Sequence, residues 1–257
     1  MISFWGSKSS GKTVFLTALF HSILTGEKKW KIQPLDDPSI KFIHDRWEEL
    51  VERHVFPQPT TREERDRIFK FGIKRKTLLG MNSKEIELDF LDPAGEFFEN
   101  PGLDAVHGNI VFNTIKNSRG LICLIDPERK QSEYFKLVLK NFSKIKETFS
   151  PQSKFYQIPI PVAICVTKLD ANAAFVNDYR KFDAESYAIK LMGEDSYRLL
   201  TSFLQIYKFF GVSSMGWDQK EKKSRISINN DGEPCPLGKP EPVNVFNALK
   251  WLLLKIK

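Results

Sequence analysis

Apolar and polar residues follow one another along most of the chain in a way that predicts strands and amphipathic helices in turn. Four short apolar runs are typical of buried strands, and they cover residues 2–5, 120–126, 161–166 and 209–212. Apolar residues three and four positions apart predict helices over residues 12–24, 131–149 and 195–207 and from residue 244 onward. Strands that alternate with helices favour a parallel sheet covered on both faces. The sequence therefore predicts a three-layer, doubly wound α/β fold.

Two further segments alternate with the period of two that is typical of strands. They cover residues 68–76 and 85–91, and Gly80-Met81-Asn82-Ser83 between them has the composition of a turn. We expect an antiparallel hairpin here. Its contribution to the mostly parallel sheet is one antiparallel edge strand.

The remaining segments are interpreted as helical and loop insertions in one domain that spans residues 1–257. Residues 26–66 contain a predicted helix at 39–54, and the Pro57-Gln58-Pro59-Thr60-Thr61 stretch that follows is assigned to a first switch loop. Residues 217–242 are predicted to be a polar loop insertion.

Composition and charge fit a globular protein with anionic partners. Hydrophobic residues make up 41% of the 257 positions and charged residues 28%, so disorder is not expected. A net charge of +7 favours nucleotide phosphates, nucleic acid or lipid headgroups without choosing among them. Two of the three cysteines, Cys123 and Cys165, lie in apolar runs, which favours a reducing cytoplasm over a disulfide framework. No apolar run reaches the roughly 20 residues that a membrane span needs.

A phosphate-binding loop is predicted between the first strand and the first helix. Gly6-Ser7-Lys8-Ser9-Ser10-Gly11-Lys12-Thr13 matches the pattern G-x-x-x-x-G-K-[ST]. In this pattern backbone N–H groups surround the β-phosphate, the lysine contacts the β- and γ-phosphates, and the threonine binds Mg²⁺. A chance Gly/Ser-rich turn is the alternative, and the position between a strand and a helix argues against it.

A second carboxylate follows the strand predicted at 85–91. Asp92-Pro93-Ala94-Gly95 has the form D-x-x-G, in which Asp92 holds a water on Mg²⁺ and the Gly95 N–H approaches a γ-phosphate. This pattern alone is expected about once by chance in a chain of this length. Its position after a buried strand and downstream of the phosphate loop is what gives it meaning.

Glu96 comes next and is a candidate for orienting the attacking water. The alternative is a solvated glutamate in a loop, because most glutamates are exposed to solvent. Thr60 or Thr61 is the candidate for a second Mg²⁺ ligand in the first switch, and ordinary turn chemistry after Pro59 is the alternative.

Two segments that follow later strands are candidates for reading the base. Thr167-Lys168-Leu169-Asp170 has the form [NT]-K-x-D, in which the carboxylate accepts hydrogen bonds from N1–H and N2–H₂ of guanine and the lysine stem packs over the base. Ser213-Ser214-Met215 follows the strand at 209–212, where its backbone could contact guanine O6. An ordinary turn is the alternative for this last segment.

With these four elements in this order, the chain resembles the Ras-like P-loop GTPases over nearly its whole length. The run from Ser10 to Leu16, the Leu124-Ile125-Asp126-Pro127 segment and Trp251-Leu252-Leu253 are further similar to bacterial double-GTPase-type domains of predicted conflict or defence systems. The resemblance implies a small-GTPase-like fold, with GTP or GDP and Mg²⁺ as ligands. It also implies catalytic roles for Lys12, Gly95 and Glu96. Lys8 stands where such proteins often have glycine, and Glu96 stands where they have glutamine.

The leading hypothesis is a molecular switch that hydrolyses GTP slowly without a partner. Dimerisation or an activating protein is the expected source of the missing positive charge, although Arg62, Arg65 and Arg67 lie near the first switch. The alternatives are an interaction module that keeps its nucleotide, and an ATPase. A protein effector is expected, and the basic run at 220–225 is assigned to a solvated loop, not to a nucleic-acid site.

Overall fold

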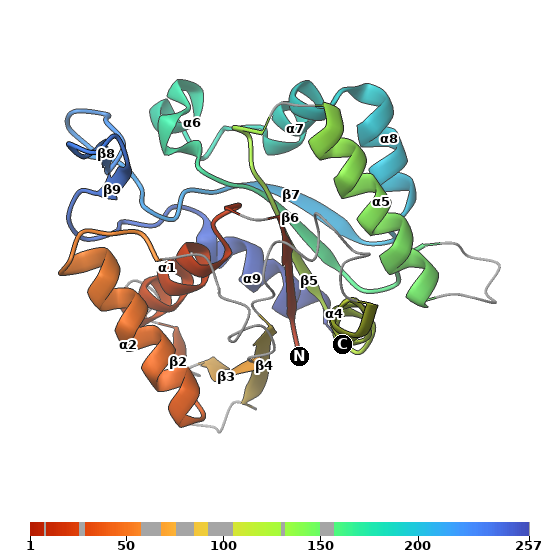
Figure 1. The fold of residues 1–257 in the computed structure, drawn as a ribbon. Coiled ribbons are helices and arrows are strands. Elements are labelled where there is room, and N and C mark those ends of the chain that lie inside the picture. Colours follow the sequence, from red (N-terminus) through yellow and green to blue (C-terminus); the bar gives the residue numbers. More distant parts are fainter. Residues whose placement is uncertain are drawn as a thin grey trace.

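The structure is a computed structural model that describes residues 1–7, 9–25, 29–57, 68–75, 85–91, 105–129, 132–149 and 157–256, without the side chains of residues 89, 91 and 105–110. Figure 1 shows the helices of these segments as coiled ribbons and their strands as arrows.

A four-stranded parallel sheet forms the centre of the fold, with the strand order β1-β5-β6-β7. The strands are β1 (Ser3–Gly6), β5 (Leu121–Ile125), β6 (Val162–Val166) and β7 (Tyr207–Gly211). Their register pairs Gly6 with Leu124, and pairs Val166 with both Ile125 and Gly211. The carboxyl ends of all four strands therefore meet along one edge of the sheet. Each of the predicted strands is confirmed.

Both faces of this sheet are covered, which explains why its strands are uninterrupted apolar runs. Leu121, Cys123 and Ile125 of β5 belong to one buried cluster, while Ile122 and Leu124 belong to another on the opposite face. The first cluster lies under α4 (Ala105–Lys116), α5 (Ser132–Phe149), α7 (Ala184–Met192) and α8 (Glu194–Ser202). The second lies under α1 (Lys12–Thr25) and α9 (Val245–Lys255) (Figure 1). These layers confirm the predicted three-layer α/β class.

The antiparallel part of the fold is larger than the single edge strand predicted from the sequence. The predicted hairpin is present as β3 (Ile68–Arg75) and β4 (Ile86–Leu91), and β2 (Trp30–Pro34) joins it to give the order β2-β3-β4. The ring of Phe90 on β4 packs 5.0 Å from that of Phe4 on β1. In β2 only Ile32 is buried, so its apolar signal is too weak to identify a strand.

Helix α2 (Asp37–Val51) lies close to the helix predicted at 39–54. Its start is fixed by Asp36, whose carboxylate accepts a hydrogen bond from the Ser39 N–H at 2.9 Å. Pro38 falls in the first turn, where its missing N–H has no helical partner to lose.

The C-terminal part contains more regular structure than the sequence pattern indicated. The helix predicted at 195–207 ends at Ser202, and β7 begins two residues before the predicted strand at 209–212. The segment predicted as a polar loop at 217–242 holds a short hairpin of β8 (Ile226–Ile228) and β9 (Pro234–Pro236). A 3-10 helix η2 (Leu169–Ala171) and helix α6 (Ala173–Asn177) follow β6.

The cysteines lie where the strand pattern placed them. Cys123 and Cys165 are fully buried in β5 and β6, all three cysteines are free thiols, and burial raises the pKa of both buried thiols. In the described part of the chain, no helix combines the length and apolar character required to cross a membrane.

We expect Phe142→Ala to lower the free energy of unfolding by about 3–5 kcal/mol, the usual cost of truncating a buried phenylalanine. Phe142 is fully buried on α5, and its ring lies edge-on to Trp5 at 5.4 Å between centroids. Urea unfolding measures the change. Leu254→Ala is the control, because 71% of Leu254 is exposed and its truncation should cost no more than about 0.5 kcal/mol. Equal losses in the two variants would contradict this packing.

Candidate nucleotide-binding site

The loop between β1 and α1 has the backbone of an anion-binding nest. Ser9 and Gly11 adopt left-handed conformations, with φ of 61° and 86°, and the Ser10 N–H donates to the Ser7 carbonyl oxygen at 3.2 Å. Turns of this kind direct successive N–H groups into one concavity. A Cβ on Gly6 would clash with Ser10 Oγ and lie 3.3 Å from Leu124 Cβ, so the close packing of the loop on β5 favours glycine here.

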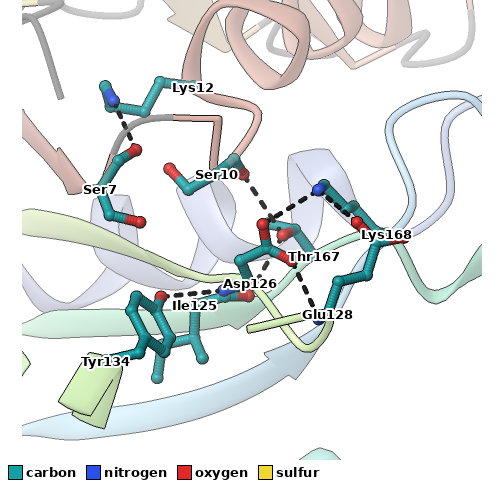
Figure 2. A network of polar contacts seen from close by, with 9 residues as sticks. All are labelled: Ser7, Ser10, Lys12, Ile125, Asp126, Glu128, Tyr134, Thr167 and Lys168. Atoms are coloured by element: carbon teal, nitrogen blue, oxygen red, sulfur yellow. Dashed lines mark hydrogen bonds and ion pairs between the residues drawn. The ribbon is translucent and has the colours of Figure 1, made fainter. Parts of the chain in front are cut away.

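Lys12 begins α1 and folds its side chain back along this loop. Its Nζ donates to the carbonyl oxygens of Gly6 at 2.9 Å and Ser7 at 3.0 Å, and only 8% of the residue is exposed (Figure 2). Burial in low dielectric strengthens the attraction of an ammonium group for an anion. The loop therefore holds a positive charge beside the N-terminus of α1, where the helix dipole adds positive potential.

Ser10 supplies a donor that the loop itself does not use. Ser10 is fully buried, and its hydroxyl oxygen has no hydrogen-bond partner in the described part of the chain. Such groups are rare in folded proteins unless a ligand or water satisfies them. The Ser10 hydroxyl faces Gly6 at the end of β1, so the donor set that fits a phosphate group consists of the Lys12 ammonium group and the first-turn N–H groups of α1.

Thr167 joins the phosphate loop to the end of β6. Its hydroxyl lies 3.3 Å from the Ser10 carbonyl oxygen and 3.1 Å from that of Ile125, and its N–H donates to the same Ile125 oxygen at 3.0 Å. Figure 2 shows Thr167 between the loop and the strand end. The first residue of the base-reading segment is thus fixed against the phosphate loop, although 157 positions separate Thr167 from Ser10.

Lys168 is held by two carboxylates that follow β5. Its Nζ lies 2.9 Å from Asp126 Oδ2 and 2.6 Å from Glu128 Oε2 (Figure 2). Burial lowers the pKa of Lys168, but the hydrogen bonds and charges of Glu128 and Asp126 outweigh it, so the pKa is raised overall. The lysine backbone is left-handed, with φ of 55°, which turns the side chain toward these carboxylates.

Asp126 is itself fixed from two sides. Only 2% of it is exposed, its Oδ1 accepts from the Glu128 N–H at 3.0 Å, and its own N–H donates to the Tyr134 hydroxyl at 3.1 Å. Burial raises the pKa of Tyr134, so its hydroxyl stays protonated. Helix α5, which carries Tyr134, is in this way connected to the lysine of the base-reading segment.

Asp170 is a buried carboxylate at the same edge of the sheet. It is 5% exposed in η2, and its Oδ1 accepts from the Ser213 hydroxyl at 2.8 Å. Ser213 is fully buried beyond the end of β7, and its oxygen in turn accepts from the Gly216 N–H at 2.8 Å. The second carboxylate oxygen, Oδ2, accepts from the Ser224 hydroxyl.

The structure thus brings three of the predicted segments to one edge of the sheet, namely the phosphate loop, Thr167 to Asp170 and Ser213 to Met215. Met215 is almost fully buried, and its carbonyl oxygen accepts from the Glu241 N–H at 2.9 Å. Six predicted site residues lie outside the described residues: Lys8, Thr60, Thr61, Asp92, Gly95 and Glu96. Their roles stay predictions.

Sequence patterns did not identify Glu128, Tyr134 or Ser224 as parts of the site, and Asp126 appeared only within a family resemblance. Asp126 had a usable signal, because it is a carboxylate directly after a buried strand of the parallel sheet. Tyr134 and Ser224 have no local signal, since only tertiary contacts bring them here, and Glu128 lies two residues after Asp126 in a segment without a recognised pattern. Among the described side chains, no three of His, Cys, Asp and Glu gather into a metal-binding group.

A phosphate-type loop, a threonine that joins it to a T-K-x-D segment, and a buried carboxylate supported by a serine after the last strand of the sheet define a P-loop GTP-binding protein. A model of the Double-GTPase 2 family matches residues 1–194, and the chain belongs to this family. No curated protein matches the sequence.

Several solved structures resemble the chain at low identity. The Ski7 GTPase-like domain of S. cerevisiae, bound to GDP and inorganic phosphate, is 16% identical with a TM-score of 0.46, over 98% of this chain and 48% of that one. An ADP-ribosylation-factor-like GTP-binding protein of Encephalitozoon cuniculi, in complex with GDP, is 16% identical with a TM-score of 0.39, over 99% and 78%. A GTP-binding protein of Sulfolobus solfataricus, in complex with GDP, is 12% identical with a TM-score of 0.39, over 100% and 53%. This chain spans about half the length of the first and third.

We expect Asp126→Asn to destabilise the protein in a pH-dependent way. The raised pKa of Lys168 stabilises the fold fully below the unfolded value of about 10.4, and this stabilisation is lost as the pH rises through the folded pKa. Breaking a fully buried pair costs about 3–5 kcal/mol. Because 32% of Lys168 is exposed and Glu128 remains, we expect the variant to lose about 1–2 kcal/mol of unfolding free energy between pH 7 and 9. The loss should be smaller above pH 11.

Urea unfolding at several pH values measures this difference. Glu133→Gln is the matched control, because Glu133 pairs with Lys136 on the surface, where 76% and 69% of the two side chains are exposed. Its effect should be small at every pH. A wild-type advantage over Asp126→Asn that stays constant from pH 8 to 11.5 would contradict the assigned pairing.

Proposed function

We propose that this protein is a guanine-nucleotide switch that binds GTP or GDP with Mg²⁺ and hydrolyses GTP to GDP and phosphate. The observation that carries the proposal is the contact of Thr167 with the Ser10 carbonyl oxygen. It fixes the phosphate-binding loop and the base-reading segment relative to each other, as recognition of one nucleotide from both ends requires.

The phosphates are held by the loop from Gly6 to Thr13. Lys12 exchanges its contacts with the carbonyl oxygens of Gly6 and Ser7 for contacts with the β- and γ-phosphate oxygens. This exchange is favourable because an anionic phosphate oxygen attracts the buried ammonium group more strongly than a neutral carbonyl oxygen does. The N–H groups from Ser9 to Thr13 supply further donors, and Lys8 would add positive charge close to the γ-phosphate.

The base is recognised by Asp170 and Lys168. The carboxylate of Asp170 accepts from N1–H and N2–H₂ of guanine, an arrangement of donors that adenine lacks. Lys168, held at its ammonium group by Asp126 and Glu128, lays its aliphatic stem along the base. An N–H of the Ser213 to Met215 segment reads O6.

Hydrolysis depends on residues assigned from the sequence pattern. Thr13 and Asp92, with Thr60 or Thr61, would hold Mg²⁺, which neutralises charge that develops on the phosphates. The Gly95 N–H contacts the γ-phosphate, and the carboxylate of Glu96 orients the attacking water. Because Glu96 brings negative charge toward the γ-phosphate, hydrolysis is slow until a partner supplies a positive group.

We expect Lys12→Ala to weaken GDP and GTP binding by about 100-fold or more. Each hydrogen bond between charged groups contributes about 1.5–3 kcal/mol, and Lys12 makes at least two with the phosphates. Titration of fluorescent GDP measures the affinity. Lys140→Ala on the exposed face of α5 is the control and should bind as the unchanged protein does. Normal GDP affinity in Lys12→Ala would contradict the assignment of the phosphate loop to the nucleotide-binding site.

Asp170→Asn tests the base. The affinity of the variant for guanine nucleotides should fall by about 100-fold, and its affinity for xanthosine diphosphate should rise. The reason is that the amide donates to the carbonyl that xanthine carries in place of the amino group. Asp231→Asn, in an exposed turn, is the control. ATP that competes with GTP in the unchanged protein would contradict the guanine assignment.

Single-turnover hydrolysis separates a slow GTPase from an interaction module that keeps its nucleotide. Bound GTP should convert to GDP within hours when Mg²⁺ is present, and chelation of Mg²⁺ should stop the conversion. Glu96→Ala should slow it by about 100-fold, the lower end of the range for general acid–base residues. Bound GTP that persists unchanged for hours with Mg²⁺ would leave the binding proposal intact and contradict the hydrolysis.

A further inference from the structure

Residues 217–224, called here the Trp217 turn, leave the end of the site and return to it. Trp217 is 1% exposed, and its ring packs edge-on at 5.6 Å from Phe175 and 6.0 Å from Tyr179. Trp217 and Ser224 form an antiparallel bridge that closes the turn. The buried indole therefore anchors one end of the turn, and the bridge places Ser224 beside it.

Hydrogen bonds within the turn fix its shape. The Asp218 N–H donates to the Lys223 carbonyl oxygen at 2.8 Å, and the Asp218 carboxylate accepts from the N–H groups of Lys220 and Glu221, both at 2.8 Å. The N–H groups of Glu221 and Lys220 lower the pKa of Asp218, so its charged form maintains the turn at neutral pH.

The residue after the turn is tied to the rest of the site. The Arg225 N–H donates to the Gly216 carbonyl oxygen at 3.2 Å, and its guanidinium group lies 2.6 Å from Glu241 Oε1. The Glu241 N–H donates to the Met215 carbonyl oxygen. Ser224 thus lies between two anchored residues, Trp217 across the bridge and Arg225 next in the chain. These anchors fix the position from which its hydroxyl donates to Asp170 Oδ2.

Asp170 consequently has one serine hydroxyl on each carboxylate oxygen, Ser213 on Oδ1 and Ser224 on Oδ2. An ionised carboxylate has about four acceptor sites. Two donors occupy two of these sites, and two remain for a ligand. The final torsion of an aspartate is broad when nothing holds it, whereas donors on both oxygens fix the carboxylate plane.

We propose that Ser224 is a positioning residue for guanine recognition, acting through Asp170. This inference rests on the proposed function. Guanine offers two parallel donors, N1–H and N2–H₂, and both reach the carboxylate only when its plane is correctly oriented. Ser224 lies in a segment beyond the residues 1–194 that match the family model.

The proposal predicts a loss that depends on the number of donors on the base. Ser224→Ala should weaken GDP binding about tenfold. It should weaken binding of inosine diphosphate less, about threefold or below, because hypoxanthine lacks the 2-amino group and makes one bond to Asp170 where guanine makes two. The preference for GDP over inosine diphosphate should therefore fall. Ser224→Thr keeps the hydroxyl and should restore the preference.

Titration calorimetry or fluorescence competition with the two nucleotides gives this ratio. Ser227→Ala, on β8 of the same insertion and in contact with Cys235 but not with Asp170, is the control and should not change the ratio. Because the measured quantity is a ratio within one variant, a general loss of stability that weakens both nucleotides equally leaves it unchanged.

Three outcomes would overturn the role of Ser224 while the protein still binds GDP. They are an unchanged GDP preference in Ser224→Ala, an increased GDP affinity, which would mean that Ser224 occupies the place of the base, and a Thr variant that behaves as the Ala variant does. Absence of GDP binding by the unchanged protein would instead contradict the proposed function together with this inference.

Discussion

The candidate site depends on the register of the parallel sheet. Because β1, β5, β6 and β7 end along one edge, the segments that follow them lie close together although they are far apart in the sequence. The Thr167 hydroxyl fixes this arrangement further, since it contacts both the phosphate loop and the end of β5. A shift of β6 by one residue would move Thr167, Lys168 and Asp170 together away from the loop.

A chain of neighbouring contacts extends from this edge into the helical layer. Tyr134 of α5 contacts Asp126, Asp126 holds Lys168, and Lys168 directly follows Thr167. The buried Asp126 carboxylate is stable there because an ammonium group and a backbone N–H satisfy it. Movement of α5 relative to the sheet would therefore change the position of Lys168, the residue that we propose to contact the base.

Much of the fold follows from sequence periodicity, and its failures have physical causes. The central strands were predictable because both of their faces are buried, which leaves uninterrupted apolar runs such as 121–125. Strand β2 was not, because its alternation covers only five residues, of which one is buried, and ends in a proline. In the site, the phosphate loop and the T-K-x-D segment have fixed local spacing. Ser224 and Tyr134 reach the site only through tertiary contacts, so no local sequence pattern predicts their part in it.

The left-handed backbone of Lys168 has a consequence for substitutions at this position. A residue with a side chain costs about 1–3 kcal/mol more in such a conformation than glycine, which adopts it freely. The contacts of the Lys168 ammonium group with Asp126 and Glu128 oppose this cost. Glycine would relieve the backbone but lose both ion pairs, so one position makes two opposing contributions to stability.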